Sequence, residues 1–66
     1  MKNPLHQRCT EIVRLLSLGK RVKEISYELD FPQHLICQDI MEARRTVQVR
    51  SAAALVARSL REGWIK

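Results

Sequence analysis

Two pairs of soft metal ligands occur in this sequence, each with a histidine three residues before a cysteine. His6 precedes Cys9 in "HQRC", and His34 precedes Cys37 in "HLIC". At this spacing the two side chains of a pair share one face of a helix, and two Cys with two His can close a tetrahedral zinc site. The pairs lack the loop-borne C-x2-C knuckle of such sites, and Cys9 also fits an apolar helix stripe. We therefore expect free thiols, no metal and no cofactor.

Side chains for covalent or acid–base catalysis form no recognisable group. The sequence has no Ser or Cys with a plausibly adjacent His and an orienting acid, and it has no glycine-rich phosphate loop. A chain of 66 residues also has little room for a concave substrate pocket. The sequence therefore argues against an enzyme.

The charge balance indicates an anionic partner. Twelve Lys and Arg against seven Asp and Glu give a net charge of +5 and a pI near 9.9. Because a cation beside a phosphate releases a condensed counterion, nucleic acid is the first candidate and an acidic protein surface the second. No apolar run reaches the roughly 20 residues that span a bilayer, and the N-terminus lacks the apolar stretch of a signal peptide. We expect a cytoplasmic protein of bacterial, phage or plasmid type, with no membrane partner.

These side chains must be positioned by helices, because 45% of the residues are apolar and the chain has only two Gly and two Pro. Apolar residues recur at steps of three and four in four segments, which predicts a single all-α domain over residues 1–66. Asn3 and Pro4 are typical of a helix start, Gly19 is typical of a helix end, and Ser51 can cap the last helix. The expected helices span about 4–18, 21–29, 32–47 and 52–62.

The second and third predicted helices, joined by a tight turn, form a helix-turn-helix arrangement. The stretches "EIVRLLSLGKRVKEISYELDF" and "VRSAAALVARSLREGWI" resemble the LuxR/GerE-type helix-turn-helix domain, with ungapped spacing. Leu5 and Arg8 also stand where that family keeps a Leu and an Arg. The resemblance extends from Leu5 to Ile65. It implies the family's four-helix fold, a DNA-binding role in transcription regulation, and a dimer that forms through the fourth helix.

The segment expected to read DNA, "FPQHLICQDIMEARR", departs from the family's pattern. Pro32 replaces the usual capping Ser, Leu35 a Thr, Cys37 a Lys and Asp39 a His. An Asp can accept a hydrogen bond from a cytosine amino group, but elsewhere near phosphates it weakens binding. We expect Leu35, Cys37 and Asp39 on the outward side of this helix.

The candidate DNA contacts divide into two sets, because Gln and Arg bond adenine and guanine edges whereas phosphate contacts fix position. The base-reading candidates are Gln33, His34, Cys37, Gln38 and Arg45, with Gln38 the best of them. The phosphate candidates are Lys20, Arg21, Lys23, Arg44 and Arg50. The alternative for both sets is a merely solvated surface.

The last predicted helix carries small and aliphatic side chains that allow another helix to approach closely. The candidate dimer-interface residues are Ala52, Leu55, Val56 and Ser59. The alternative is that Leu55, Val56 and Leu60 only cover the first helix.

The sequence thus predicts a small stand-alone regulator of transcription that binds double-stranded DNA as a homodimer. The alternative is a protein-binding module of anti-activator type, whose degenerate helix-turn-helix modulates a second transcription regulator or RNA polymerase. Leu35, Ile36, Cys37 and Met41 would give that module an apolar patch if Leu35 and Met41 are exposed.

Overall fold

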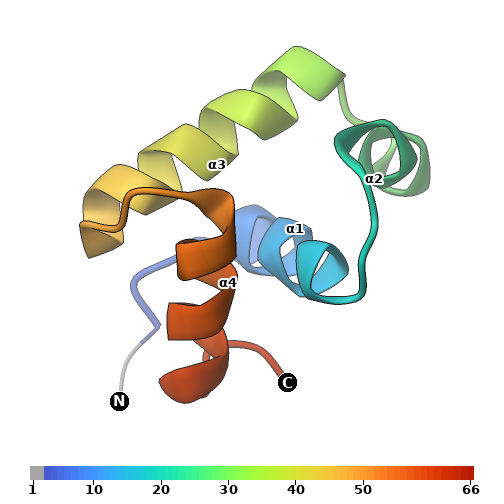
Figure 1. The fold of residues 1–66 in the computed structure, drawn as a ribbon. Helices are drawn as coiled ribbons and strands as arrows, with labels where there is room; N and C mark the ends of the chain where they lie inside the picture. The colour runs from blue at the N-terminus through green and yellow to red at the C-terminus, as the bar shows by residue number, and fades with distance from the viewer. Residues whose placement is uncertain (1–2) are drawn as a thin grey trace.

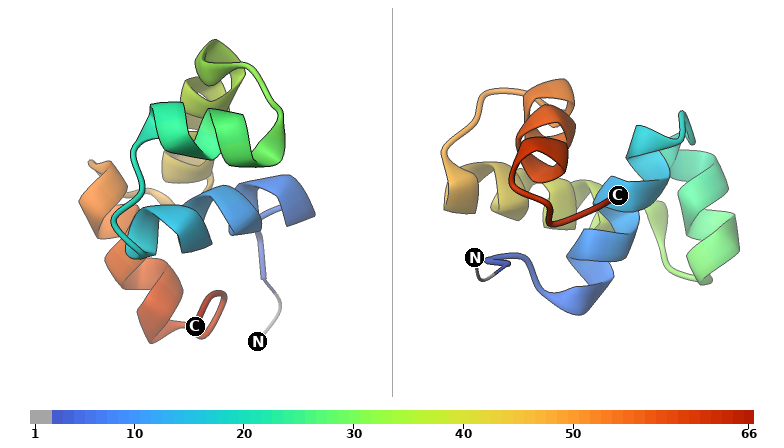
Figure 2. Two further views of the ribbon diagram at one scale, coloured as in Figure 1. Left: turned by 90° about the vertical axis from the view of Figure 1, so that its right-hand side faces the viewer. Right: turned by 90° about the horizontal axis from the view of Figure 1, so that it is seen from below.

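The computed structural model describes residues 3–66, in which every regular element is an α-helix (Figure 1). The four helices are α1 (Gln7–Ser17), α2 (Val22–Leu29), α3 (Gln33–Val47) and α4 (Ala52–Arg61). Both α1 and α3 pack against all the other helices, whereas α2 and α4 make no contact with each other within residues 3–66. Figure 2 shows α2 and α4 on opposite sides of α1. The predicted all-α, four-helix fold is confirmed.

The start of α1 differs from the prediction, because the helix begins at Gln7 and not at residue 4. Its N-cap is His6, whose Nδ1 accepts a hydrogen bond from the backbone N–H of Cys9 at 3.0 Å. Asn3 instead closes a short turn, since its Oδ1 accepts from the N–H of Leu5 at 2.9 Å. This turn directs Leu5 into the core before the helix starts, so the expected Asn3–Pro4 cap is wrong.

Gly19 and Ser51 act at helix ends as predicted. Two other helices end at residues that have a Cβ and adopt the left-handed conformation. Gly19 follows α1 with φ 85°, and the Ser51 Oγ caps α4 by accepting from the N–H of Ala54 at 3.0 Å. Asp30 after α2 and Gln48 after α3 adopt left-handed φ angles of 51° and 59°. Side chains with a Cβ rarely adopt this conformation, because the Cβ approaches the following carbonyl oxygen.

The core lies where α1 meets the other three helices. Every helix contributes at least one buried side chain to it, and the fully buried ones are Cys9, Ile12, Val13, Leu15, Ile25, Ile36, Leu55 and Ser59. Apolar burial of this kind supplies the main driving force for folding. In the described residues no helix is both long enough and apolar enough to cross a membrane.

The buried face of α4 corrects the predicted dimer interface. Leu55 and Ser59 are 0% exposed within a single chain, so neither can contact a second copy. The Ser59 hydroxyl donates to the Leu55 carbonyl oxygen at 2.7 Å, which satisfies it inside the core. Ala52 and Val56 are half-buried at the edge of the same face. The outward face of α4, defined here as Ala53, Val56, Ala57 and Leu60, follows the same helical spacing one position later.

Candidate nucleic-acid interface

A tight turn between α2 and α3 sets the relation of these two helices. Asp30 ends α2 in the left-handed conformation, and the N–H of Phe31 donates to the Ser26 carbonyl oxygen at 3.0 Å. The Ser26 hydroxyl donates in return to the Phe31 carbonyl oxygen at 2.5 Å. Pro32, with φ −58°, then precedes the first residue of α3. The unit of α2, turn and α3 has the helix-turn-helix arrangement, in which the second helix is the one that enters a groove.

The outward stripe of α3, defined here as His34, Gln38, Met41 and Arg45, lies opposite its buried side. These positions recur at steps of four, three and four, and all of them are exposed. Gln33 and Cys37 are also exposed, beside the stripe. Within residues 3–66 no hydrogen bond or ion pair involves the side chain of any base-reading candidate, that is Gln33, His34, Cys37, Gln38 or Arg45. These side chains are therefore available to an external partner.

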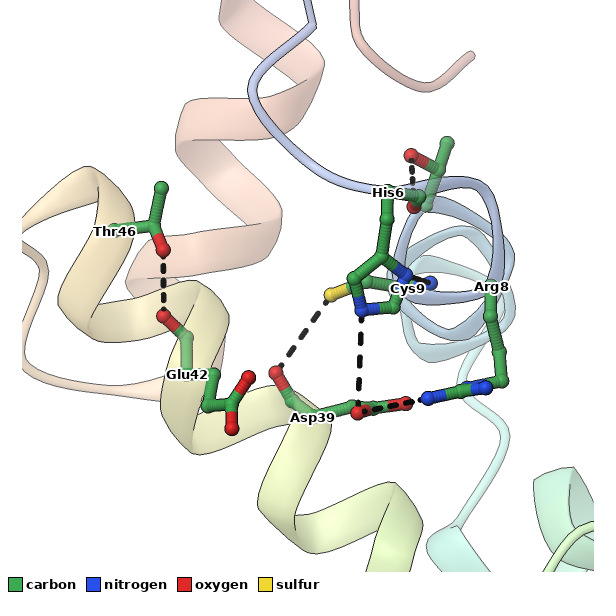
Figure 3. A network of polar contacts seen from close by, with 7 residues as sticks. His6, Arg8, Cys9, Asp39, Glu42 and Thr46 are labelled. Atoms are coloured by element: carbon green, nitrogen blue, oxygen red, sulfur yellow. Dashed lines mark hydrogen bonds and ion pairs between the residues drawn. The ribbon is translucent and has the colours of Figure 1, made fainter.

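Asp39 does not lie on the outward side of α3, and this corrects the prediction. It is 7% exposed and faces α1 (Figure 3). Its helical spacing from the buried Ile36 and Ala43 puts it on the same side of α3 as these residues. Its carboxylate accepts from Arg8 Nε at 2.8 Å and from a terminal nitrogen of Arg8 at 3.3 Å. Leu35 is half-buried, so of the three residues expected outward only Cys37 is fully so. Asp39 therefore makes an internal ion pair and cannot contact a cytosine.

Further contacts from α1 surround Asp39. The Cys9 thiol lies 3.7 Å from the Asp39 backbone carbonyl oxygen, to which it donates (Figure 3). Because His6 Nδ1 accepts the capping hydrogen bond, the proton of a neutral His6 ring is on Nε2, which lies 4.0 Å from the Asp39 carboxylate. The Arg8 guanidinium lies 4.3 Å from the centroid of the Phe31 ring. Thus side chains at the start of α1 contact both α3 and the turn between α2 and α3.

The electrostatics of this cluster follow from its contacts. The hydrogen bond to Asp39 raises the pKa of Arg8 above its ordinary value. Burial, followed by the negative charge of Asp39, raises the pKa of the Cys9 thiol to about 11. The thiol is therefore protonated at neutral pH and remains a hydrogen-bond donor.

The phosphate candidates differ in their surroundings. Arg21 and Lys23 at the start of α2 and Arg50 after α3 are exposed, whereas Lys20 is half-buried. Arg44 is also half-buried, and its guanidinium donates to the Arg50 carbonyl oxygen. Arg44 therefore ties the end of α3 to the link before α4, a structural contact that the sequence did not reveal.

The acid that stays exposed on α3 is Glu42. Thr46 Oγ1 donates to the Glu42 backbone carbonyl oxygen at 2.9 Å, and no ion pair in the described residues involves the Glu42 carboxylate. Glu42 precedes Ala43, whose side chain is buried, and lies beside the outward stripe. Its charge weakens attraction to a polyanion at this position.

The two His–Cys pairs lie in different surroundings. Cys9 is buried and Cys37 is exposed. Among residues 3–66, no three His, Cys, Asp or Glu side chains are grouped so that they could hold a metal ion.

A curated protein and a solved structure are similar to this chain, whereas no protein-family model matches it. The transcriptional regulatory protein DesR of Bacillus subtilis (strain 168) is 31% identical over 64 residues, which are 97% of this chain and 32% of DesR. The chain thus spans about a third of the length of that relative. The structure of the transcription factor GerE matches with a TM-score of 0.94 and 23% identity, over 98% of this chain and 97% of the GerE chain. The chain therefore has the LuxR/GerE-type helix-turn-helix fold that its sequence predicts.

Proposed function

We propose that this chain binds double-stranded DNA through the outward stripe of α3 and thereby regulates transcription. The observation that carries the proposal is an exposed row of hydrogen-bonding side chains, His34, Gln38 and Arg45, without partners in the described part of the chain. Asp39, which would repel phosphates from the same helix, is turned inward and neutralised by Arg8. The likeness to DesR and GerE, a transcriptional regulatory protein and a transcription factor, supports the same role.

Two residues of the stripe, Gln38 and Arg45, would read bases. A Gln side chain can bond an adenine edge through two hydrogen bonds, and an Arg can do the same with guanine. Gln38 and Arg45 have these groups on one side of α3, two helical turns apart. Arg21, Lys23 and Arg50 would contact phosphates, which fixes the position of the domain but does not select sequence.

A homodimer would present two reading helices to two half-sites. The outward face of α4 consists of small and aliphatic side chains, and Leu60 in it is 48% exposed. Alanines at positions 53 and 57 allow a second helix to approach closely, and pairing the same face on both copies gives a two-fold axis. We therefore assign the dimer contact to Ala53, Val56, Ala57 and Leu60, in place of the buried Leu55 and Ser59.

The alternative function is a protein-binding module that modulates a second regulator or RNA polymerase. The apolar patch expected for this module is reduced, because Leu35 is half-buried and Ile36 is fully buried. Met41, 51% exposed in the middle of the outward stripe, still favours this module, because a flexible thioether adapts to an apolar groove on a protein partner. On this alternative the stripe would bind protein in place of DNA.

A salt series on labelled duplex DNA separates the two functions. DNA binding predicts that log K falls linearly with log salt, by about 0.9 per phosphate neutralised. No binding at low salt, or a slope near zero, would exclude the DNA-binding proposal and leave the protein-binding module.

Two substitutions then test the assigned roles. Gln38→Ala should relax preference at one base position, at a cost of about 1–3 kcal/mol for the preferred site. Lys23→Ala should weaken all sequences alike and reduce the salt slope by about one phosphate. Lys66→Ala removes the same charge at the chain end that lies away from α3 in Figure 1, and serves as the control. Equal losses from Gln38→Ala on every sequence would mean that α3 binds without reading bases.

A further inference from the structure

We infer that Arg8, Asp39 and Phe31 form a clamp that fixes the orientation of α3, so that Arg8 and Asp39 are positioning residues for DNA reading. The inference rests on the proposed DNA-binding function for its biological role. Its geometric part concerns the protein alone.

The clamp joins three parts of the fold through one side chain. Arg8 on α1 bonds Asp39 on α3 through two nitrogens, at 2.8 and 3.3 Å, and its guanidinium lies 4.3 Å from the centre of the Phe31 ring in the turn. Two parallel hydrogen bonds between a guanidinium and a carboxylate fix direction as well as distance. Arg8 therefore restrains α3 relative to α1 and to the turn at the same time.

The backbone of Asp39 is restrained from the same side. The Cys9 thiol donates to the Asp39 carbonyl oxygen at 3.7 Å, and His6 lies 4.0 Å from the carboxylate (Figure 3). Apolar contacts of Ile36 and Ile40 also hold α3 in the core, but burial of apolar surface is not directional. The directional contacts between α1 and α3 in the described residues are those that end on Asp39.

Asp39 lies among the candidate base-reading residues of α3, so a restraint on Asp39 also affects the position of these residues. Gln38 immediately precedes Asp39 in the sequence, and His34 and Arg45 lie on either side of it along α3. A base contact with two hydrogen bonds needs good geometry, so rotation of α3 about its axis would displace Gln38 from a base edge. Contacts of flexible cations with phosphates tolerate such a rotation better. Loss of the clamp should therefore reduce sequence preference more than overall affinity.

The test compares specific with non-specific DNA affinity in Asp39→Asn. This variant keeps the shape of the side chain and changes the net charge from +5 to +6 by removal of one carboxylate, so attraction to any duplex should not fall. We expect the ratio of specific to non-specific affinity to drop about tenfold or more, as for a lost base contact. Glu42→Gln is the matched control, because it changes the same charge on the same helix at an exposed carboxylate and should leave the ratio unchanged.

A second variant and a second measurement separate the effect of the clamp from changes in protein stability and from DNA binding. Arg8→Lys keeps the charge but loses the two-pronged hydrogen bond, so it should lower the ratio in the same direction. Affinities are measured far below the midpoint of thermal unfolding, with the folded fraction taken from the melting curve. Residual dipolar couplings of the free protein report the angle between α1 and α3, which should change in both variants.

Three results of these measurements would lead to different conclusions. If the angle stays as in the wild type, the clamp is overturned whatever the DNA affinities are. If the angle changes but the affinity ratio does not, the role in reading is overturned. If the wild type binds no DNA, the proposed function fails, while the couplings still decide whether Arg8 and Asp39 position α3.

Discussion

Replacing Gln48 by Gly is expected to stabilise this protein by about 0.5–1 kcal/mol. Gln48 ends α3 with φ 59° and ψ 51°, and its N–H donates to the carbonyl oxygens of Arg44 and Arg45. The left-handed conformation costs a residue with a Cβ about 1–2 kcal/mol, which Gly avoids. Gly also gives the unfolded chain more freedom, which offsets about 0.4–1 kcal/mol of that gain. The hydrogen bonds of the helix end come from the backbone and remain in place.

Urea unfolding followed by circular dichroism measures this change, and thermal unfolding gives a second value. In a domain of this size 1 kcal/mol corresponds to about 4–8 °C in the midpoint, so an increase of about 2–8 °C is expected. Gln48→Ala is the control, since it keeps the Cβ and removes only an exposed side chain. Equal stability of the Gly and Ala variants would show that the strain at position 48 does not arise from the Cβ.

Two further predictions concern Cys9 and the α4 surface. Folding raises the pKa of Cys9 from 9.0 to about 11, so the folded state holds this proton more tightly; the resulting stability is complete below pH 9 and is lost as pH rises toward about 11. Unfolding titrations between these pH values should show the loss, and Cys9→Ala should remove that part of it. Ala57→Glu on the outward face of α4 should give a monomer in sedimentation velocity, whereas Ser59→Ala, inside the core, should leave the oligomeric state unchanged; a dimer that survives Ala57→Glu would contradict the assigned contact.

Much of the fold could be predicted because its signals are local. Apolar residues at steps of three and four predict helices, since one face must be buried, and the four helices are found where these patterns occur. Gly19 and Ser51 also act as expected, because a left-handed turn and a helix cap depend on the residue itself. The first cap differed because Asn3 and His6 both have suitable acceptors, and in the structure Asn3 accepts from Leu5 whereas His6 accepts from Cys9 at the helix start.

The site was harder to predict because its decisive contacts are distant in sequence. An Asp on an amphipathic helix is expected to face water, and its burial depends on Arg8, which lies 31 residues earlier. Arg8 belonged to the family pattern, but nothing in the sequence indicates which acid it meets. Small residues occur on all sides of α4, so the sequence pattern does not show which side is buried. Leu55 and Ser59 were predicted on the dimer side of α4 but lie on its buried side.

The inner and outer sides of α3 differ in their contacts, and this bears on how the proposed DNA specificity could change. The ion pair with Arg8 and the buried apolar contacts of α3 lie on its inner side, whereas the side chains at positions 34, 38, 41 and 45 are exposed and make no hydrogen bond or ion pair in the described residues. Substitutions there are nearly free of folding constraints. On the proposed DNA-binding function, α3 is therefore a surface on which new target sites can be acquired one residue at a time, while the scaffold beneath stays the same.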